Sequence, residues 1–301
     1  MRIDVECIPC FARQALLTVR RATDDDAVQL RVMKEVGRLV ADISPEMCPP
    51  ELAEQIYGII SSMTGNEDPY VADKKSANDL VLGLEPEFQE VLNKSEDALL
   101  ECVKLAISGN YIDLGLTSDY GDIGVKAREV LAAGLGVDDY AQFRETLTKA
   151  AHVLVIGDNT GEIVFDRMLI ERMSKVSDCR FTYMVRGRPV INDVTIEDAV
   201  TVGIDRLAAV ADTGDGAPGL VLSRCSEEAR RLFMSADMVI SKGQGNYEAL
   251  SDAPRDIFFL LLSKCDAVSR ELDTTLGAAV LKHHVAMQTS LPSSLDAGAC
   301  S

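Results

Sequence analysis

The pattern of apolar and polar positions divides the chain into two parts. Up to about residue 145, apolar positions recur with the spacing of amphipathic helices, as in 28–43 and 51–63. From His152 onward, short apolar runs alternate with helical stretches, which is typical of a mainly parallel sheet covered by helices. The runs that we expect to be strands are 153–156, 181–185, 207–210, 238–240 and 257–262.

The chain length fits an α/β fold of two unequal domains. The 301 residues exceed one average domain and can bury a substantial core. We expect a helical domain at 1–148, an α/β domain at 149–288 and a flexible tail at 289–301, which is rich in Ser and Ala.

The composition limits the kinds of binding partner and the cellular compartment that we expect for this protein. Acidic side chains outnumber basic ones by 48 to 30, and the net charge of −18 opposes nonspecific binding to nucleic acid or to anionic membranes. No signal segment is visible, and no apolar run approaches the roughly 20 residues needed to span a bilayer. We therefore expect a cytoplasmic protein whose eight cysteines are mostly thiols.

The most informative segment is the first expected strand and the polar residues after it. Residues 153–156 form an apolar run that ends just before Asp158 and Asn159, and an apolar helical face follows at 163–173. Asp158 and Asn159 are therefore expected at the carboxyl edge of the sheet, where α/β folds bind ligands. Carboxylate and amide oxygens are ligands for hard divalent metals.

Two further loops after expected strands carry related chemistry. One contains Asp193, which with Asp158 and Asn159 can supply three oxygen ligands to Mg²⁺ or Mn²⁺. The other contains Lys242, whose ammonium group can neutralise a phosphate. Gly243 and Gly245 follow it and let backbone N–H groups approach that phosphate. Positioning and charge stabilisation suffice for phosphoryl transfer, so these parts predict a phosphate-handling site.

Simpler interpretations exist for each acidic residue. Asn159-x-x-Glu162 is close to a helix capping box, and Thr195-x-x-Asp198 has the same spacing. Asp193 would then be a solvated loop residue. Together at three strand ends, however, these residues favour a functional site.

The loop Thr213-Gly-Asp-Gly-Ala-Pro-Gly219 contains G-x-G-x-x-G after an expected strand. This prompts the alternative of an S-adenosylmethionine-dependent methyltransferase. Ser241 and Lys242 stand where a dinucleotide site would need an acidic residue, so a plain turn is favoured.

Cys7-x-x-Cys10 has the spacing of a metal or redox site, with Cys48 and Cys265 as unproven further ligands. A non-catalytic metal- or redox-binding module is thus a third alternative to buried structural thiols. The only histidines are His152, His283 and His284, which gives little support to a nucleophile that relies on a histidine base.

Several motifs in order along the chain resemble the metal-dependent damage-control phosphatases once grouped as domain of unknown function 89. They cover most of the chain. They are Cys7-x-x-Cys10 with Gln14, Asp68-Pro-Tyr70 with Lys74 and Asn78, Ser108-Gly-Asn110-Tyr-Ile-Asp113, Gly157-Asp-Asn-Thr-Gly-Glu162, Arg186-Gly with Asn192-Asp193, and Ser241-Lys-Gly-Gln-Gly-Asn246. The short archaeal and bacterial branch with the N-terminal CxxC is the nearest match.

The resemblance implies a three-layer α/β/α sandwich with a Rossmann-like sheet and an N-terminal helical domain. It implies a divalent metal, Mg²⁺, Mn²⁺, Co²⁺ or Ni²⁺, at Asp158, Asn159 and Asp193, and a phosphate-binding lysine at Lys242. The resemblance also implies that the protein hydrolyses small phosphorylated metabolites, such as sugar phosphates. The residues that we expect to contact or enclose such a substrate are Lys74, Asn110, Asp113, Glu162, Gly243, Gly245 and Asn246, although Lys74 and Asn78 alternatively share an exposed helix face. Either water or Asp158 can be the nucleophile.

Overall fold

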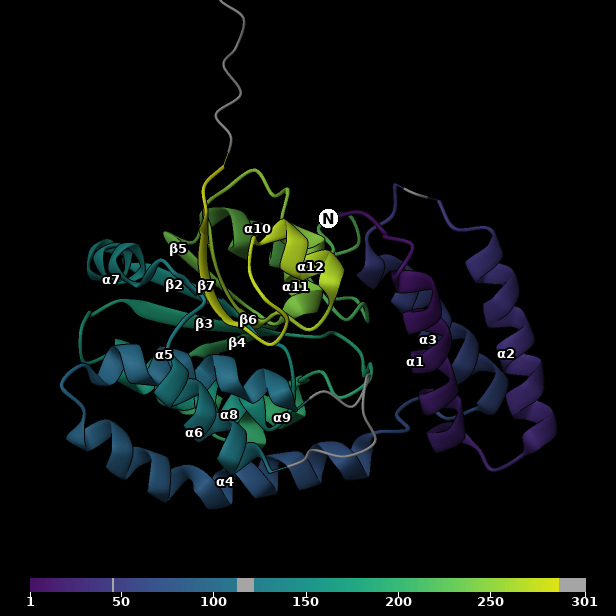
Figure 1. Cartoon of the computed structure of the whole chain (residues 1–301), viewed down its shortest axis with the longest axis horizontal. Helices are drawn as coiled ribbons and strands as arrows, with labels where there is room; N and C mark the ends of the chain where they lie inside the picture. Colours follow the sequence, from purple (N-terminus) through teal and green to yellow (C-terminus); the bar gives the residue numbers. More distant parts are fainter. Residues whose placement is uncertain (45, 113–121, 287–301) are drawn as a thin grey trace, which may run out of the picture.

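The computed structural model describes residues 1–44, 46–112 and 122–286, and its strands form one sheet of seven. The strand order is β1-β7-β6-β5-β2-β3-β4, and every neighbouring pair is parallel except β6 and β7. The strands are β1 (Val137–Asp138), β2 (His152–Ile156), β3 (Arg180–Val185), β4 (Ala209–Asp212), β5 (Met238–Lys242), β6 (Ile257–Leu262) and β7 (Ala279–His284). The predicted mixed α/β chain with a mainly parallel sheet is confirmed (Figure 1).

Twelve α-helices lie in the described residues, and their starts follow from local chemistry. The Asp25 carboxylate accepts hydrogen bonds from the first turn of α2, and α3 starts with two prolines, whose fixed φ suits a first turn. The helices are α1 (Cys7–Ala22), α2 (Asp26–Ala41), α3 (Pro49–Thr64), α4 (Val71–Lys94), α5 (Ala98–Ser108), α6 (Ile123–Ala133), α7 (Tyr140–Lys149), α8 (Glu162–Met173), α9 (Ile196–Thr201), α10 (Glu227–Ser235), α11 (Gln244–Leu250) and α12 (Asp266–Glu271).

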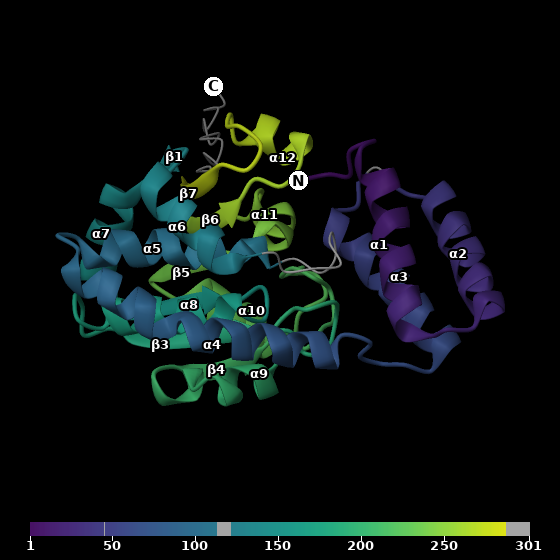
Figure 2. The same cartoon turned by 60° about the horizontal axis from the view of Figure 1, so that its bottom comes forward.

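Alternate residues of each central strand point to opposite faces of the sheet. In β2, Val153 and Val155 join a core formed with α4, α5 and α8, whereas Leu154 and Ile156 join a second core with α10, α11 and α12. Figure 2 shows the first group of helices lying across one side of the sheet. Burial on both faces explains why the strands read as continuous apolar runs.

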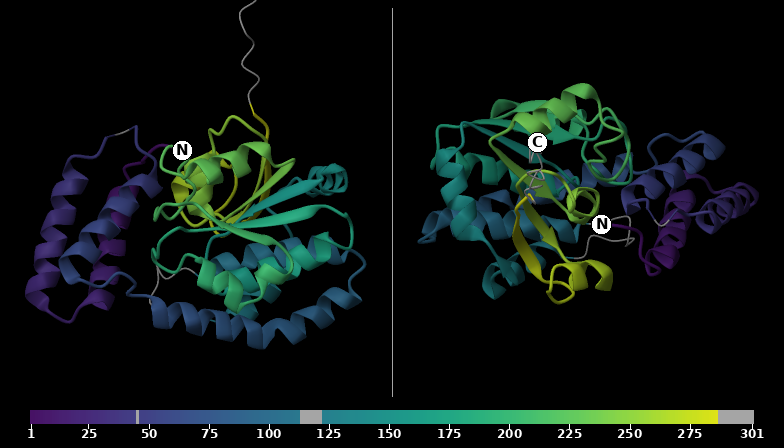
Figure 3. Two further views of the ribbon diagram at one scale, coloured as in Figure 1. Left: turned by 180° about the vertical axis from the view of Figure 1, so that it is seen from behind. Right: turned by 90° about the horizontal axis from the view of Figure 1, so that it is seen from above.

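The helices before the sheet fall into two groups. The first three pack on one another around their own core and stand to one side of the sheet, as both views of Figure 3 show. The buried residues of α4, α5, α6 and α7 belong instead to the same core as the sheet. The boundary at residue 148 stays a prediction, but the shared core ties α4–α7 to the strands.

Three strand assignments differ from the sequence-based ones. The strand expected at 207–210 lies at Ala209–Asp212, and β1 and β7 were not expected. The polar residues at the end of β7, Lys282, His283 and His284, hide its strand pattern, because β7 is covered on both sides only over its first residues. Asp113 and the tail at 289–301 lie outside the described residues. Within the described ranges, no helix is long and apolar enough to cross a membrane.

The order of the strands creates a crevice beside β2. The chain leaves β2 for β3 and β4 on one side, whereas β5 and β6 lie on the other side. Such a reversal is where open α/β sheets bind ligands, outside the carboxyl ends of the strands. The carboxyl ends of β2 and β5 therefore define the place to look for a site.

Candidate active site

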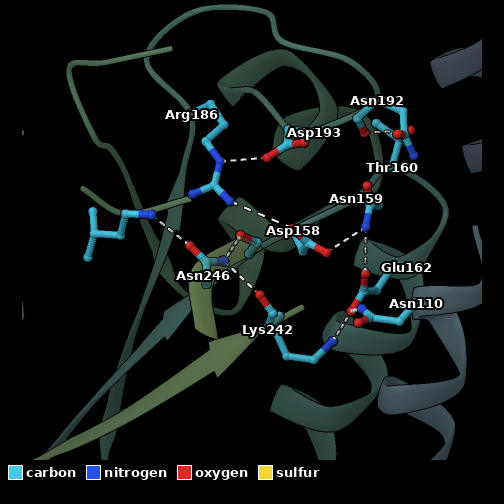
Figure 4. Close-up of polar contacts among 12 residues, drawn as sticks. Asn110, Asp158, Asn159, Thr160, Glu162, Arg186, Asn192, Asp193, Lys242 and Asn246 are labelled. Carbon is cyan, nitrogen blue, oxygen red and sulfur yellow. Dashed lines mark hydrogen bonds and ion pairs between the residues drawn. The ribbon is translucent and has the colours of Figure 1, made fainter. Parts of the chain in front are cut away.

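Asp158 and Asn159 follow β2 and lie at this crevice, almost completely buried. The Asn159 Nδ2 group donates a hydrogen bond to Asp158 Oδ2 at 2.6 Å and another to Glu162 Oε2 at 3.3 Å. The Asn159 side-chain oxygen points away from those two carboxylates (Figure 4). The amide thus restrains Asp158 while its oxygen stays available to a ligand.

Asp193 reaches the same place from the loop after β3. An isolated antiparallel bridge pairs Asn159 with Asp193, and the Val194 N–H donates to the Asp158 carbonyl at 2.9 Å. Asp193 is only 3% exposed, so its interpretation as a solvated loop residue is wrong. The structure therefore brings the three predicted metal ligands together through backbone pairing between two loops.

The capping interpretation holds for one segment and fails for the other. Helix α8 begins at Glu162 with Gly161 as its N-cap and has no side-chain cap, so Asn159 and Glu162 do not form a capping box. Thr195 and Asp198 do form one at the start of α9. The polar contacts of Asn159 are thus directed to the site and not to the helix end.

Arg186 is a buried cation between the two carboxylates. Its Nε donates to Asp193 Oδ2 at 2.6 Å, and its Nη2 lies 3.7 Å from Asp158 Oδ1. Neither Nη1 nor Nη2 has a hydrogen-bond partner among the described atoms, although both are buried. The motif Arg186-Gly marked this residue in the sequence, but its ion pairing could not be foreseen from spacing.

Lys242 lies beneath the site and not in it. Its ammonium group donates to the Ala106 carbonyl at 3.0 Å and to the carboxylates of Glu162 and Asp166, and its side chain is fully buried. Burial alone would lower the pKa of Lys242, but the charges of Asp166 and Glu162 outweigh it and hold that pKa above its ordinary value. All three ammonium hydrogens are engaged within the protein, which leaves none for a phosphate.

Tyr183 and Asn110 extend this buried network. We call the five residues Lys242, Glu162, Asp166, Tyr183 and Asn110 the Lys242 network. The Tyr183 hydroxyl donates to Asp166 Oδ2 at 2.7 Å, and Asn110 Nδ2 donates to Glu162 Oε1. Sequence reasoning missed Asp166 and Tyr183. The available signal was a carboxylate within the apolar stretch of α8, where a charge requires a buried partner.

The charge balance around Asp158 favours a bound cation. Burial, together with the negative charges of Glu162 and Asp193, raises the pKa of Asp158 well above its usual value, while Lys264 and Arg186 act in the opposite direction. Within the described ranges, no three His, Cys, Asp or Glu side chains are close enough to form a metal site. A metal would rest on two carboxylates, the Asn159 amide and further oxygens, a donor set that suits a hard divalent ion.

Gly243, at the end of β5, leaves room for the Asp158 carboxylate. Its φ is +79°, and a Cβ atom at this position would lie 1.9 Å from Asp158 Oδ2. Only glycine is compatible with both the left-handed backbone and this close approach. The predicted importance of Gly243 thus has a steric basis in the position of Asp158.

Above these carboxylates lies an open pocket with a cavity volume of about 190 Å³. Its wall combines the site carboxylates with residues from α1, α11 and the loop after β6. That wall includes Asp158, Asn159, Asp193, Cys7, Cys10, Gln244, Gly245, Glu248, Lys264 and Cys265. Sequence reasoning also missed Lys264, which lies two positions beyond the expected strand at 257–262, in a fourth loop after a strand end.

Comparisons with known proteins place this geometry in a family. A model of the damage-control phosphatase ARMT1-like domain matches residues 3–280. The chain belongs to the damage-control phosphatase ARMT1-like family. It is 33% identical to Damage-control phosphatase PH1575 of Pyrococcus horikoshii over 282 residues, covering 93% of this chain and 97% of that protein. It is 30% identical to a damage-control phosphatase of Archaeoglobus fulgidus over 289 residues, covering 94% and 99%.

A solved structure agrees with the fold. The crystal structure of the DUF89 family protein PH1575 from Pyrococcus horikoshii superposes with a TM-score of 0.87 at 32% identity, over 94% of this chain and 99% of that one. Membership in the damage-control phosphatase family supports a phosphatase in metabolite repair, which is the class that the sequence motifs predicted.

Other residues predicted for the site bind the backbone around it or lie outside the pocket. Asn78 Oδ1 accepts from the Gly161 N–H at 2.7 Å, and Asn246 bonds to the carbonyls of Gly157 and Lys242, so both fix backbone at the site. Lys74 pairs with Asp68 at 3.1 Å and lines a separate surface pocket. Lys74 and Asn78 are both buried, so the shared exposed face is wrong for them.

The glycine loop at 213–219 does not fit a cofactor fingerprint. Helix α10 begins only at Glu227, so no helix opens at these glycines as a dinucleotide loop requires. The Thr213 hydroxyl instead accepts from the Asp215 N–H within the loop at 3.2 Å. A plain turn is what the structure has, and the methyltransferase alternative loses its physical basis.

Proposed function

We propose that this chain is a metal-dependent phosphatase that hydrolyses small phosphorylated metabolites, sugar phosphates or related phosphomonoesters, in metabolite damage control. The observation that carries the proposal is the convergence of Asp158, Asn159 and Asp193 on one pocket at the strand-order reversal. Asp158, Asn159 and Asp193 would hold a divalent metal. When bound, such an ion supplies charge stabilisation to a transferring phosphoryl group.

We assign the phosphate-binding role to Lys264, in place of the Lys242 that the resemblance implied. Lys264 lines the pocket, and its positive charge acts against the rise in the pKa of the Asp158 carboxyl. The Lys264 backbone N–H donates to Gln244 Oε1 at 2.9 Å, which fixes the backbone of Lys264 relative to α11. A chain of net charge −18 recruits an anionic substrate best when a cation such as this one stands in the pocket.

The ligand set is tested by metal restoration. We would measure hydrolysis of p-nitrophenyl phosphate and a panel of sugar phosphates by chelator-stripped protein, before and after addition of Mg²⁺, Mn²⁺, Co²⁺ or Ni²⁺. We expect kcat/KM of Asp158→Ala to fall at least about 1,000-fold, because the variant lacks a carboxylate that would bind the metal and thereby help to stabilise the phosphoryl group. Asp212→Ala, at the end of β4 and outside the pocket, is the matched control. Metal-independent activity, or an Asp158→Ala variant with normal turnover, contradicts the proposal.

The lysine assignment is tested by separating KM from kcat. Lys264→Ala removes a point charge from the pocket wall, so we expect KM for a phosphomonoester to rise about tenfold, which corresponds to about 1.4 kcal/mol of binding free energy. Lys264→Arg should recover part of this loss. An unchanged KM in Lys264→Ala would contradict this assignment and favour another cation, such as Arg186, whose Nη2 lies 3.7 Å from Asp158 Oδ1.

A further inference from the structure

Three thiols from distant parts of the chain meet on the wall of the pocket. Cys7 and Cys10 lie in the first turn of α1, and Cys265 is the N-cap of α12. All three line the pocket, are half-buried, and are not joined in disulfides. The phosphatase site uses none of them, so their assembly calls for a separate explanation.

The fold brings Cys7 to α12 by fastening the first six residues. The N-terminal ammonium group donates to the Glu248 carbonyl at 2.9 Å, and Arg270 of α12 pairs with Asp4 at 3.2 Å and Glu6 at 3.4 Å. These contacts hold the residues just before α1 against α11 and α12. Cys7 therefore lies within electrostatic range of both Cys10 and Cys265.

The spacing of Cys7 and Cys10 suits a disulfide. Residues three apart on a helix have Cβ atoms about 5–6 Å apart, and a disulfide needs about 3.5–4.5 Å, so a small adjustment of one turn suffices. The turn in question is the first of α1, whose N-cap residue Glu6 makes no side-chain cap. A helix end without a side-chain cap tolerates this adjustment better than a helix interior would.

The surroundings favour an uncharged form of these sulfur atoms. The pKa of the Cys7 thiol is raised to about 11, mainly by burial; Glu248, Cys265 and Cys10 contribute to the rise, whereas a hydrogen bond with the Asp4 backbone opposes it. Burial is also the main cause of a raised pKa at Cys265. A disulfide resists reduction when its reduced form gains no stability as a thiolate, which is the situation here.

A metal bound by these thiols fits the geometry less well. A zinc site needs close ligands that are deprotonated together. Among the residues that the structure describes, no three His, Cys, Asp or Glu side chains are near enough to hold an ion. Gln14 and Gln244 instead donate to the sulfur atoms of Cys10 and Cys265, each at 3.4 Å.

We propose that Cys7 and Cys10 form a reversible disulfide on the wall of the pocket, by exchange with a low-molecular-weight disulfide. One thiol attacks that disulfide, forms a mixed disulfide and releases one small thiol. The second cysteine then displaces the other small thiol, and the two sulfur atoms become bonded. The small disulfide is reduced to two thiols, and the protein loses two hydrogen atoms.

The test uses intact full-length protein in a Cys300→Ser background, with a chelator present. The native protein is equilibrated in mixtures of reduced and oxidised glutathione, its remaining thiols are alkylated, and mass spectrometry follows. We expect two thiols per chain to be lost and the tryptic peptide 3–13, which contains both cysteines, to be roughly 2 Da lighter and unalkylated. The disulfide should persist in an equimolar mixture of the two glutathione forms.

Variants separate this disulfide from general thiol oxidation. Cys10→Ser should keep peptide 3–13 from becoming lighter, whereas Cys48→Ser should oxidise as the parent does. Cys48 is the matched control, because it is also a half-buried helix N-cap whose thiol pKa is raised to about 11 by burial. Thermal unfolding verifies that both variants are folded.

Three results would overturn the proposal: full retention of thiols in excess oxidised glutathione, a bond mapped from Cys7 to Cys265, or glutathione adducts with no internal bond. None of these readouts depends on phosphatase activity, so they stand apart from the test of the metal site.

Discussion

Two lysines near Asp158, Lys242 and Lys264, occupy opposite environments, although both lie at the carboxyl ends of neighbouring parallel strands. Lys242 is the last residue of β5 and has no exposed surface, while Lys264 stands two positions beyond β6 on the pocket wall. The ammonium group of Lys242 donates all its hydrogen bonds to partners within the protein, whereas Lys264 lines a pocket that a ligand can enter. A strand-end lysine is thus a structural or a binding residue according to whether it lies inside or beyond the strand.

The parity of the strand explains the environment of Lys242. Met238 and Ile240 belong to the core with α5 and α8, and alternation in β5 directs Lys242 to that same face. There it meets Ala106 of α5 and Glu162 and Asp166 of α8. A residue beyond the strand end is free of this constraint and can lie over the sheet edge, as Lys264 does.

The strongest way to break the comparison is Lys242→Met. Removing one partner of a buried ion pair leaves uncompensated charge, so we expect a loss of about 3–5 kcal/mol in the free energy of unfolding at pH 7.5. Urea unfolding measures it, and Lys264→Met is the control that should change stability by less than about 0.5 kcal/mol. Equal losses in the two variants would show that the two regions do not differ in the way described.

Gly243→Ala tests the boundary between the two regions, because this residue separates Lys242 from the Asp158 carboxylate. The new Cβ would displace Asp158, so we expect kcat/KM to fall about 100-fold, or about 2.7 kcal/mol in transition-state stabilisation.

Gly277→Ala is the matched control for this change. Gly277 has a φ of +81°, close to the +79° of Gly243, but no atom lies within 4 Å of its added Cβ. The control carries the backbone strain without the clash. If both variants lose activity equally, strain and not displacement of Asp158 is the cause.

Sequence alone predicted the main strands and placed the candidate metal ligands after strand ends, because both depend on local patterns. Apolar runs mark β2, β3, β5 and β6, and polar residues follow them at fixed positions. Asp166 was missed, and Cys265 could be named only as one possible partner of the CxxC segment. Cys265 lines the same pocket as Cys7 and Cys10, and Asp166 pairs with Lys242. Only the strand order and the packing of α8 bring these positions, remote in sequence, together.

The smallest predicted effect is a pH dependence of stability that originates in the Lys242 network. Burial raises the pKa of Asp166 to about 6 despite the opposing charge of Lys242, because Glu162 shares the same cation. The folded chain therefore binds a proton more tightly here than the unfolded chain does. The resulting stability is fully present below about pH 4 and is lost as the pH rises through about 6.

Asp166→Asn should remove this dependence while keeping the shape of the side chain. We expect the difference in unfolding free energy between parent and variant to change by on the order of 1 kcal/mol from pH 5 to pH 7, with the parent relatively less stable at the higher pH. Urea unfolding of chelator-treated protein at both pH values measures it. A difference that stays constant with pH would mean that Asp166 is ionised throughout, and that Lys242 neutralises it in preference to Glu162.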